Sequence, residues 1–359
     1  MQIQSNELDF KGQNIYVGLD VHKNQWKATI MLDDLALKTF SQPPDPDTLH
    51  KYLRTNFPGG NYYTAYEAGF CGFWPHKRLE ELGIHSMVVN PADIPTTDKE
   101  KRQKEDKRDS RKIAKGLRSG DLRAIYVPSD KTLEDRLLLR TRFTLVKDLN
   151  RNKNRIKSLL HFYGIKLPER FSSPQSHWSK SFMTWLESIE FKEESAAKSL
   201  SLRINQCKQL RQGLLEITRE IRKLSKTEAY WKRVKLLTSI KGIGLINAMV
   251  ILTELETIAR FKKLDGLCAY IGLIPTTNST GNNENTGDIT PRRHRLLRTL
   301  LVEASWVAIR NDPALTMCYA NLTKRMEPNK AIIRIAKKLL NRIRYVLKNE
   351  KEYTLATLR

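Results

Sequence analysis

Four carboxylates stand at positions from which they could hold metal ions. Asp20 ends the apolar run IYVGLD, Glu67 ends the run YYTAYE, and Asp106 and Asp109 open a basic stretch that is expected to be helical. Carboxylates at strand ends of α/β folds lie at the open edge of the sheet, where ligands bind. The spacing of Asp106 and Asp109 puts them on one helical face. If the fold gathers all four, their repulsion requires cations, and magnesium or manganese would then assist phosphodiester chemistry.

The surroundings of Asp106 and Asp109 allow a plainer interpretation, in which both carboxylates pair with neighbouring cations. The basic setting favours the metal site, because acidic residues inside a Lys/Arg-rich segment resemble a metal site in a nucleic-acid groove. This segment is therefore predicted to contact nucleic acid as well. In the plainer interpretation the partners are Lys107, Arg108 and Arg111, and these three cations together with Lys112 are predicted to contact nucleic acid.

A second candidate is the turn SIKGIG, residues 239–244, between two apolar helical stretches. Two glycines in a tight turn expose backbone N–H groups next to a helix N-terminus, which bind a phosphate without reading the base sequence. Lys241, Gly242 and Gly244 are predicted to make this contact. Glycines also permit plain packing between helices, so that alternative stays open.

The polar segment 276–290 is expected to be a loop, and it contains Ser279 followed by Thr280. A serine on such a loop can be a nucleophile, but most such loops are only turns. No histidine is fixed near it by the sequence to act as its base. The residues alone therefore do not establish chemistry at this loop.

Two basic helices are expected within the C-terminal region, over 292–310 and 330–348. Arg292 and Arg293 open the first of them. The cations of both helices could follow a nucleic-acid backbone, or they could simply face solvent.

The chain has 359 residues, with 63 Lys and Arg against 39 Asp and Glu, so its formal net charge is +24. A surplus of this size predicts a polyanionic partner, most commonly nucleic acid, although solvated basic faces would also produce it. No apolar run approaches the roughly 18 residues of a membrane span, and no signal peptide is evident, which predicts a cytoplasmic protein without a membrane partner. The four scattered cysteines indicate neither a disulfide framework nor a zinc site.

Two to three domains are expected for this length. Residues 12–127 are predicted to form a mixed α/β domain, since three hairpin-like strands precede strands that alternate with helices, the last strand being AIYV at 124–127. Residues 130–228 are predicted to form two long helices that pair as an antiparallel coiled-coil arm, with Asn152 at a seam position; a plain helical bundle is the alternative. Residues 230–350 are predicted to be all-helical.

Several of these segments together resemble the DEDD transposases of bacterial insertion sequences, in the family numbered one hundred and ten with its eleven-eleven subgroup, which includes the pilin-gene invertases. The matching segments are GLDVHK around Asp20, YEAGF around Glu67, the D-x-x-D of EDKRDSRKIA, and the C-terminal runs IKGIGLINAMVILTEL, AYIGLIPTTNSTG and GDITPRRHRLLRTLLVEASW. The resemblance covers nearly the whole chain, and the ordered combination of motifs is highly specific.

This resemblance implies an RNase H-like N-terminal domain of the Holliday-junction-resolvase kind, in which Asp20, Glu67, Asp106 and Asp109 bind Mg²⁺, with Mn²⁺ as the alternative ion. It also implies a helical C-terminal transposase domain, with a helix-hairpin-helix-like turn, that supplies a serine for a covalent link to DNA. Family members are guided by a structured bridge RNA that pairs with donor and target DNA. They assemble their active site between subunits, as dimers or tetramers.

Ser279 is favoured as the nucleophile because it is the only serine of its segment, and Thr280 is the competing assignment. The predicted function is therefore that of a transposase, acting on DNA of the bacterial nucleoid. One alternative is a metal-dependent, resolvase-like nuclease that uses water in place of serine. Another is a non-catalytic nucleic-acid-binding protein.

Overall fold

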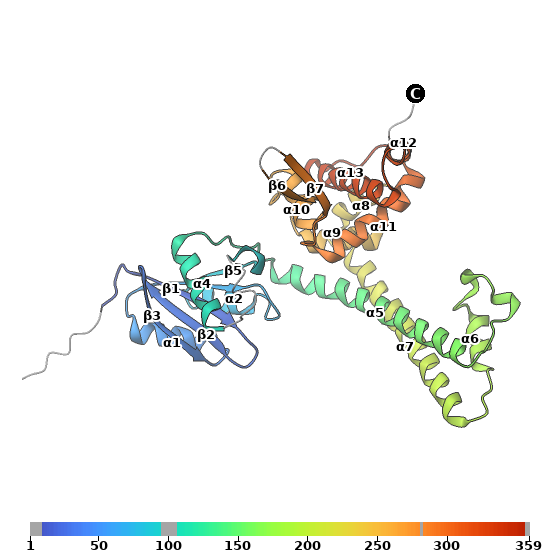
Figure 1. Cartoon of the computed structure of the whole chain (residues 1–359), viewed down its shortest axis with the longest axis horizontal. Helices are drawn as coiled ribbons and strands as arrows, with labels where there is room; N and C mark the ends of the chain where they lie inside the picture. Colours follow the sequence, from blue (N-terminus) through green and yellow to red (C-terminus); the bar gives the residue numbers. More distant parts are fainter. Residues whose placement is uncertain (1–8, 95–105, 281–282, 356–359) are drawn as a thin grey trace, which may run out of the picture. The chain divides into compact units, whose positions relative to one another are not determined.

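The computed structural model describes residues 9–94, 106–280 and 283–355, except for the side chains of 106–108, 277–280 and 283–286. The chain divides into two compact units, the first ending at Val127 and the second beginning at Pro128 (Figure 1). None of the helices in the described ranges is long and apolar enough to cross a membrane. The candidate carboxylates belong to the first unit and the candidate serine to the second.

The first unit is built on a five-stranded sheet in the order β3-β2-β1-β4-β5. The first three strands form antiparallel hairpins, whereas β1, β4 and β5 run parallel to one another. The strands are β1 (Asn14–Val21), β2 (Trp26–Leu32), β3 (Leu35–Gln42), β4 (Asn61–Glu67) and β5 (His85–Val89). The predicted hairpin strands, and the mixed α/β class of this region, are confirmed.

One expected strand of this unit is wrong. Residues 124–127 form only an isolated bridge, between Val89 and Ala124. The N–H of Ile125 donates to the carbonyl oxygen of Val88, and Pro128, which has no N–H to donate, follows three residues later. The segment therefore touches the edge of β5 without extending the sheet.

Alternation along β1 assigns its two faces to different helices. Ile15, Val17 and Leu19 are fully buried in the core that α1 and α2 cover. Gly18 points to the opposite face, against which α4 packs. The helices are α1 (Pro46–Asn56), α2 (Trp74–Glu81) and α4 (Asp106–Ser119).

The second unit begins with two long helices, α5 (Asp130–Phe162) and α7 (Glu194–Leu224), with the short α6 (Lys180–Glu187) between them. They lie side by side and antiparallel, because Nε of Arg142 donates to Oγ1 of Thr218, and Nδ2 of Asn152 donates to the carbonyl of Arg203 at 2.8 Å. Asn152 is buried. The antiparallel pairing of the two helices is thus observed, while a true coiled-coil supercoil stays a prediction.

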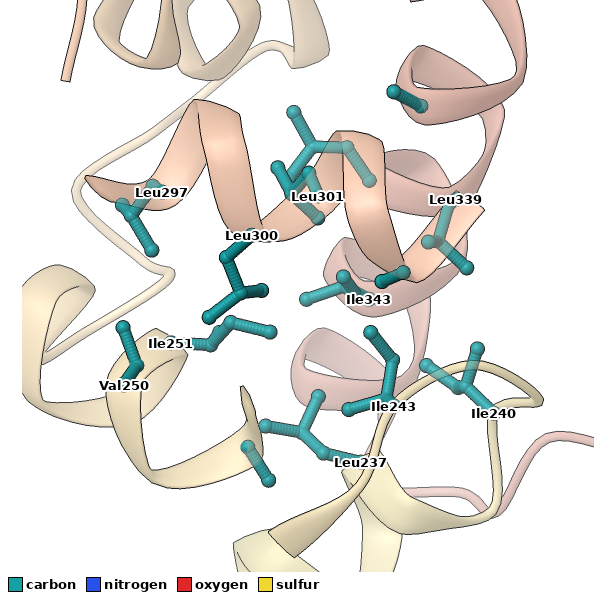
Figure 2. Packing of buried hydrophobic residues seen from close by; sticks show 14 of the residues in the cluster. Leu237, Ile240, Ile243, Val250, Ile251, Leu297, Leu300, Leu301, Leu339 and Ile343 are labelled. Carbon is teal, nitrogen blue, oxygen red and sulfur yellow. The ribbon is translucent and has the colours of Figure 1, made fainter. Parts of the chain in front are cut away.

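The remaining helices of the second unit pack around one apolar core. Figure 2 shows Leu237 of α8, Ile243 of the following turn, Leu300 of α11 and Ile343 of α13 pointing into it. The helices are α8 (Trp231–Thr238), α9 (Leu245–Leu255), α10 (Leu264–Ile271), α11 (Arg295–Asn311), α12 (Pro313–Thr323) and α13 (Pro328–Asn349). The helices predicted for residues 230–350 are thus present around this core.

The segment expected to be a loop is instead a β-hairpin, so the prediction of an all-helical region is wrong at this place. Strands β6 (Pro275–Thr280) and β7 (Asn283–Ile289) pair antiparallel in a two-stranded sheet. The segment is polar, but it is rich in threonine, whose branched β-carbon favours extended backbone. The polar composition of this segment is thus explained by a two-stranded ribbon that lies outside the apolar core, and not by a loop.

Candidate functional site

Asp20 and Glu67 lie at the carboxyl ends of two neighbouring parallel strands. In the register of β1 and β4, Leu19 is opposite Tyr66, so Asp20 and Glu67 are the next pair along the sheet. Both are partly buried, and Oδ2 of Asp20 lies 3.0 Å from Nε2 of His22. The strand pairing therefore places two of the predicted ligands at the same edge of the sheet.

Helix α4 runs antiparallel to β1 and directs its first turn toward this edge. A Cβ atom at Gly18 would clash with the carbonyl oxygen of Ser110, so glycine is what allows the helix to lie this close. The Ser110 hydroxyl lies 2.9 Å from Oγ1 of Thr29, which is opposite Gly18 in the sheet. Arg118, near the end of α4, pairs with Asp34 in the turn beside the first residues of β1.

Asp106 and Asp109 belong to that first turn of α4. The side chain of Asp106 lies outside the described residues. The side chain of Asp109 lies 4.0 Å from Nζ of Lys112, a long i,i+3 contact, whereas the plainer interpretation names Lys107, Arg108 and Arg111 as the partners. Among the described residues, no three His, Cys, Asp or Glu side chains form a group that could hold a metal ion. A complete predicted set would include Asp106.

The cations predicted to contact nucleic acid in this segment are only partly covered. Arg111 is exposed and Lys112 is half-buried. The side chains of Lys107 and Arg108 lie outside the described residues. Their contact with nucleic acid stays a prediction.

In the turn at 239–244, close packing against α11 requires glycine at position 242. Gly242 has a φ of +93°, and a Cβ atom there would come within 2.5 Å of the carbonyl oxygen of Ala304 in α11. Lys241 and Gly244 are exposed, and Gly244 precedes the first residue of α9. Close helix packing is therefore sufficient to explain Gly242, and the phosphate contact of this turn stays a prediction.

The hairpin of β6 and β7 carries the candidate nucleophile. Ser279 and Thr280 are the last two residues of β6, and Ser279 is opposite Glu284 of β7. The side chains of all three lie outside the described residues. The base of the hairpin is described, and there the N–H of Thr290 donates to the carbonyl oxygen of Ile274 at 2.9 Å.

The two predicted basic helices correspond to α11 and α13. Arg292 and Arg293 are exposed in the turn before α11. Arg334 and Lys338 are exposed on α13, whose other face is buried, for example at Leu339. These cations are accessible to a polyanion, as the predicted nucleic-acid contact requires.

A buried charged cluster, which the sequence did not suggest, connects α5, α9 and the start of α11. Glu254 of α9 is 1% exposed and accepts hydrogen bonds of 2.8 and 2.9 Å from Arg140 of α5. It also lies 3.1 Å from Nε2 of His294, whose Nδ1 accepts the N–H of Leu297 at the start of α11. Burial raises the pKa of Glu254, but the hydrogen bonds from His294 and Arg140 outweigh it and lower the pKa to about 2.

One signal in the sequence could have indicated this cluster. Glu254 is a charged residue near the end of the apolar helical run LINAMVILTEL, and a buried charge requires partners. The identity of the partners could not be found in the same way, because Arg140 lies 114 positions earlier in the chain.

Comparison with known protein families identifies both regions. Residues 17–165 match the model of the DEDD transposases of the IS110 type, described as a transposase. This stretch holds the sheet edge with Asp20 and Glu67 and all of α5, so the class defined by this part of the fold is that of the DEDD transposases. Residues 234–320, which include the β6–β7 hairpin, match the model described as the transposase IS116/IS110/IS902 family. The two matches cover more than half of the chain, which belongs to this family.

Individual relatives agree with the family. The chain is 25% identical over 306 residues to the transposase for insertion sequence element IS1533 of Leptospira borgpetersenii, covering 82% of this chain and 85% of that protein. It is 24% identical over 279 residues to the transposase for element IS1111A of Coxiella burnetii, covering 75% and 73%. It is 28% identical over 247 residues to the y4qE protein of Sinorhizobium fredii, where the match covers 68% of this chain and 58% of that protein.

Proposed function

We propose that this chain cuts and rejoins DNA as the transposase of an insertion sequence, through a covalent phosphoserine intermediate. The observation that carries the proposal is the placement of Asp20 and Glu67 side by side at one sheet edge, toward which the first turn of α4 is directed. The sheet, with three antiparallel strands followed by two parallel ones, is consistent with the RNase H-like fold that the family resemblance implies.

The donor set of this edge suits a divalent cation. Asp20, Glu67, Asp106 and Asp109 would hold Mg²⁺, or Mn²⁺, through carboxylate oxygens, which are the ligands both ions prefer. The bound ion would supply positive charge to a phosphodiester in the site. His22, whose Nε2 lies 3.0 Å from Oδ2 of Asp20, would orient that carboxylate toward the ion. The ligands come from two adjacent strands and one helix, all within the first unit.

The C-terminal unit would supply the nucleophile. The Ser279 oxygen forms a bond to phosphorus as the bond from phosphorus to the 3′ oxygen breaks; the serine hydroxyl loses its proton and the leaving oxygen gains one. Since one phosphoester replaces another, the intermediate keeps the bond energy needed for rejoining. Thr280 is the competing nucleophile.

The partners of this function would be donor and target duplex DNA and a structured bridge RNA, with the protein acting as a homo-oligomer on the nucleoid DNA of a bacterial cytoplasm. The net charge of +24, and the exposed cations on α13 and before α11, support contacts with several phosphate backbones. The exposed turn residues Lys241 and Gly244 are further candidates for such contacts.

The test is a search for the covalent adduct. The protein is expressed from a plasmid that carries its coding sequence with the natural flanking DNA, and DNA that stays bound to protein in detergent is quantified. We expect an adduct that Ser279→Ala abolishes and Thr280→Ala retains, and that Asp20→Asn abolishes as well.

The other outcomes identify the alternatives. An adduct that survives Ser279→Ala but is lost in Thr280→Ala moves the nucleophile to Thr280. Free DNA ends without any adduct indicate the nuclease that uses water. An Asp20→Asn protein with unchanged activity indicates a non-catalytic nucleic-acid-binding protein.

A further inference from the structure

One arginine holds together the two ends of the β6–β7 hairpin. Arg298, in the first half of α11, donates from Nη1 to the carbonyl oxygen of Gly272 at 3.1 Å and to that of Thr290 at 2.7 Å. Gly272 ends α10 just before β6, and Thr290 directly follows β7. The side chain is half-buried. A single guanidinium thus bridges the residue at which the chain enters the hairpin and the one at which it leaves.

The backbone geometry at the base of the hairpin, around Gly272 and Thr290, leaves little conformational freedom to either segment. Gly272 has a φ of +85°, and a Cβ atom there would come within 2.5 Å of Cβ of Arg293 and 2.7 Å of the carbonyl oxygen of Arg292. The backbone hydrogen bond of 2.9 Å from the N–H of Thr290 to the carbonyl oxygen of Ile274 also joins the two segments at the base. The carbonyl groups that Arg298 binds are therefore held next to each other in one arrangement.

The helix that carries Arg298 is itself anchored to the rest of its unit. His294, one turn earlier, accepts the N–H of Leu297 at the start of α11 and contacts the buried Glu254. Glu254 in turn receives both hydrogen bonds from Arg140 of α5. The orientation of the hairpin base is thereby connected to α9 and α5.

We propose that Arg298 is a positioning residue, which fixes the direction in which the β6–β7 hairpin leaves the helical core and so places its hydroxyl residue for attack on DNA. This inference rests on the proposed function of Ser279. Arg298 does not itself act on the phosphodiester in this role.

A small change of angle at the base of the hairpin displaces the residues near its tip. At about 3.3 Å per strand residue, Ser279 lies roughly 13 Å along β6 from Pro275. A rotation of about 5° at the base would displace it by roughly 1 Å, and a misplacement of that size can slow a reaction about 100-fold. Loss of the contacts from Arg298 should therefore reduce reaction much more than it reduces binding of DNA.

The experiment compares Arg298→Lys and Arg298→Ala with the wild-type chain in the adduct assay described above. Arg219→Ala, which removes an exposed cation from α7, is the control for lost charge. Hydrogen exchange at the Thr290 amide reports the hairpin base without any DNA. Binding of a random-sequence DNA duplex and thermal unfolding of each variant are measured in parallel.

We expect adduct formation to fall about tenfold in Arg298→Lys and about 100-fold in Arg298→Ala. Exchange at Thr290 should become faster in both, while DNA binding stays within twofold. Guanidinium at tens of millimolar should restore part of the reaction in Arg298→Ala, by occupying the vacated place; this rescue would not occur if the variant had merely lost stability. Arg219→Ala should behave as wild type. If Arg298→Ala does not fold, Arg298→Lys decides.

Adduct formation at the wild-type rate in Arg298→Lys and Arg298→Ala would overturn the inference, as would a slow reaction with unchanged exchange at Thr290. Failure of the proposed function has a different signature. The wild-type chain would then form no adduct, or one that persists in Ser279→Ala. Faster exchange at Thr290 in the Arg298 variants would still show that Arg298 holds the base of the hairpin.

Discussion

In the first unit two of the four candidate carboxylates are part of the main sheet, whereas in the second unit the candidate nucleophile is carried on a two-stranded ribbon. Asp20 and Glu67 end strands that continue into a fully buried core. Ser279 lies near the tip of a hairpin whose described anchors are at its base, around Gly272 and Thr290. The first arrangement suits carboxylates, whose mutual repulsion has to be resisted by a stiff scaffold.

The difference also shows what each unit depends on. Placement of the carboxylates depends on how closely α4 approaches β1, which Gly18 controls. Placement of the hairpin depends on a small number of polar contacts and on Gly272. Substitutions at these points should therefore affect the carboxylates and the hairpin separately, and their expected effects are given below in decreasing order.

Gly18→Val should have the largest effect. Its side chain would occupy the space of the Ser110 carbonyl oxygen and the Ala114 nitrogen, so α4 must move away from the sheet. We expect the first unit to lose about 3 kcal/mol or more of stability, and DNA cleavage to fall at least about 100-fold. Denaturant unfolding and the adduct assay measure the two effects.

Gly83→Ala is the matched control in the same unit. Gly83, unlike Gly18, has a positive φ, of +76°, but no atom lies within 4 Å of its added Cβ. It should therefore cost only about 1 kcal/mol of backbone strain and leave cleavage intact. Equal losses in the two variants would contradict the role given to the contact between α4 and β1.

Gly272→Ala should act on the hairpin alone. The new Cβ meets both backbone strain at a φ of +85° and a contact of 2.5 Å with Cβ of Arg293. We expect a loss of about 2–4 kcal/mol and at least about a tenfold slower adduct formation. Gly164→Ala, with a φ of +68° and no atom within 4 Å, isolates the strain. An adduct yield as low in the control would show that the close approach is unimportant.

The Glu254 cluster should make the second unit sensitive to acid. Its pKa is about 2 when folded, against an ordinary value of 4.5. Its contribution to stability, on the order of 3 kcal/mol, is therefore complete above about pH 4.5 and is lost as the pH falls through 2. Urea unfolding between pH 2 and pH 6 measures the change.

Glu254→Gln should remove most of this dependence, because the amide does not titrate. It should also destabilise the unit near neutral pH, since Arg136 and Arg140 then lack the carboxylate that faces them. If the variant kept the acid dependence of the wild type, another carboxyl group would be responsible.

Ser110→Ala should have the smallest effect. It removes the buried contact of 2.9 Å with Thr29, whose hydroxyl keeps a second partner in Thr39. We expect a loss of about 1 kcal/mol and nearly unchanged cleavage, since the backbone of α4 still rests on Gly18. A large loss of cleavage would mean that this hydrogen bond, rather than the glycine, positions the helix.

Much of the fold followed from local patterns. The alternation of apolar residues predicted β1, β2 and β3, and the three- and four-residue spacing of Ile204, Cys207 and Ile221 predicted α7. These features are local, because each depends on neighbours within one element. The hairpin at β6 and β7 was missed, since its polar composition is as typical of a loop as of a ribbon outside the core.

The candidate site was only partly accessible from the sequence. Asp20 and Glu67 could be proposed as ends of strands, but their adjacency depends on β1 pairing with β4, although β2, β3 and α1 intervene in the chain. Gly242 was weighed as a phosphate contact, yet its contact with Ala304 joins residues far apart in the chain. Arg298 and the Glu254 cluster gave no local signal of their partners.

The sequence by itself therefore determined most of the elements, the basic charge, the order of the carboxylates and the family resemblance, because these depend on residue types and short spacings. Only the tertiary structure decided which residues meet: the register that puts Asp20 beside Glu67, the antiparallel course of α4 over Gly18, and the bridge from Arg298 to Gly272 and Thr290. The physical reason is that such contacts depend on the packing of distant segments, where the fit of one small residue or one charged group selects among many possible arrangements.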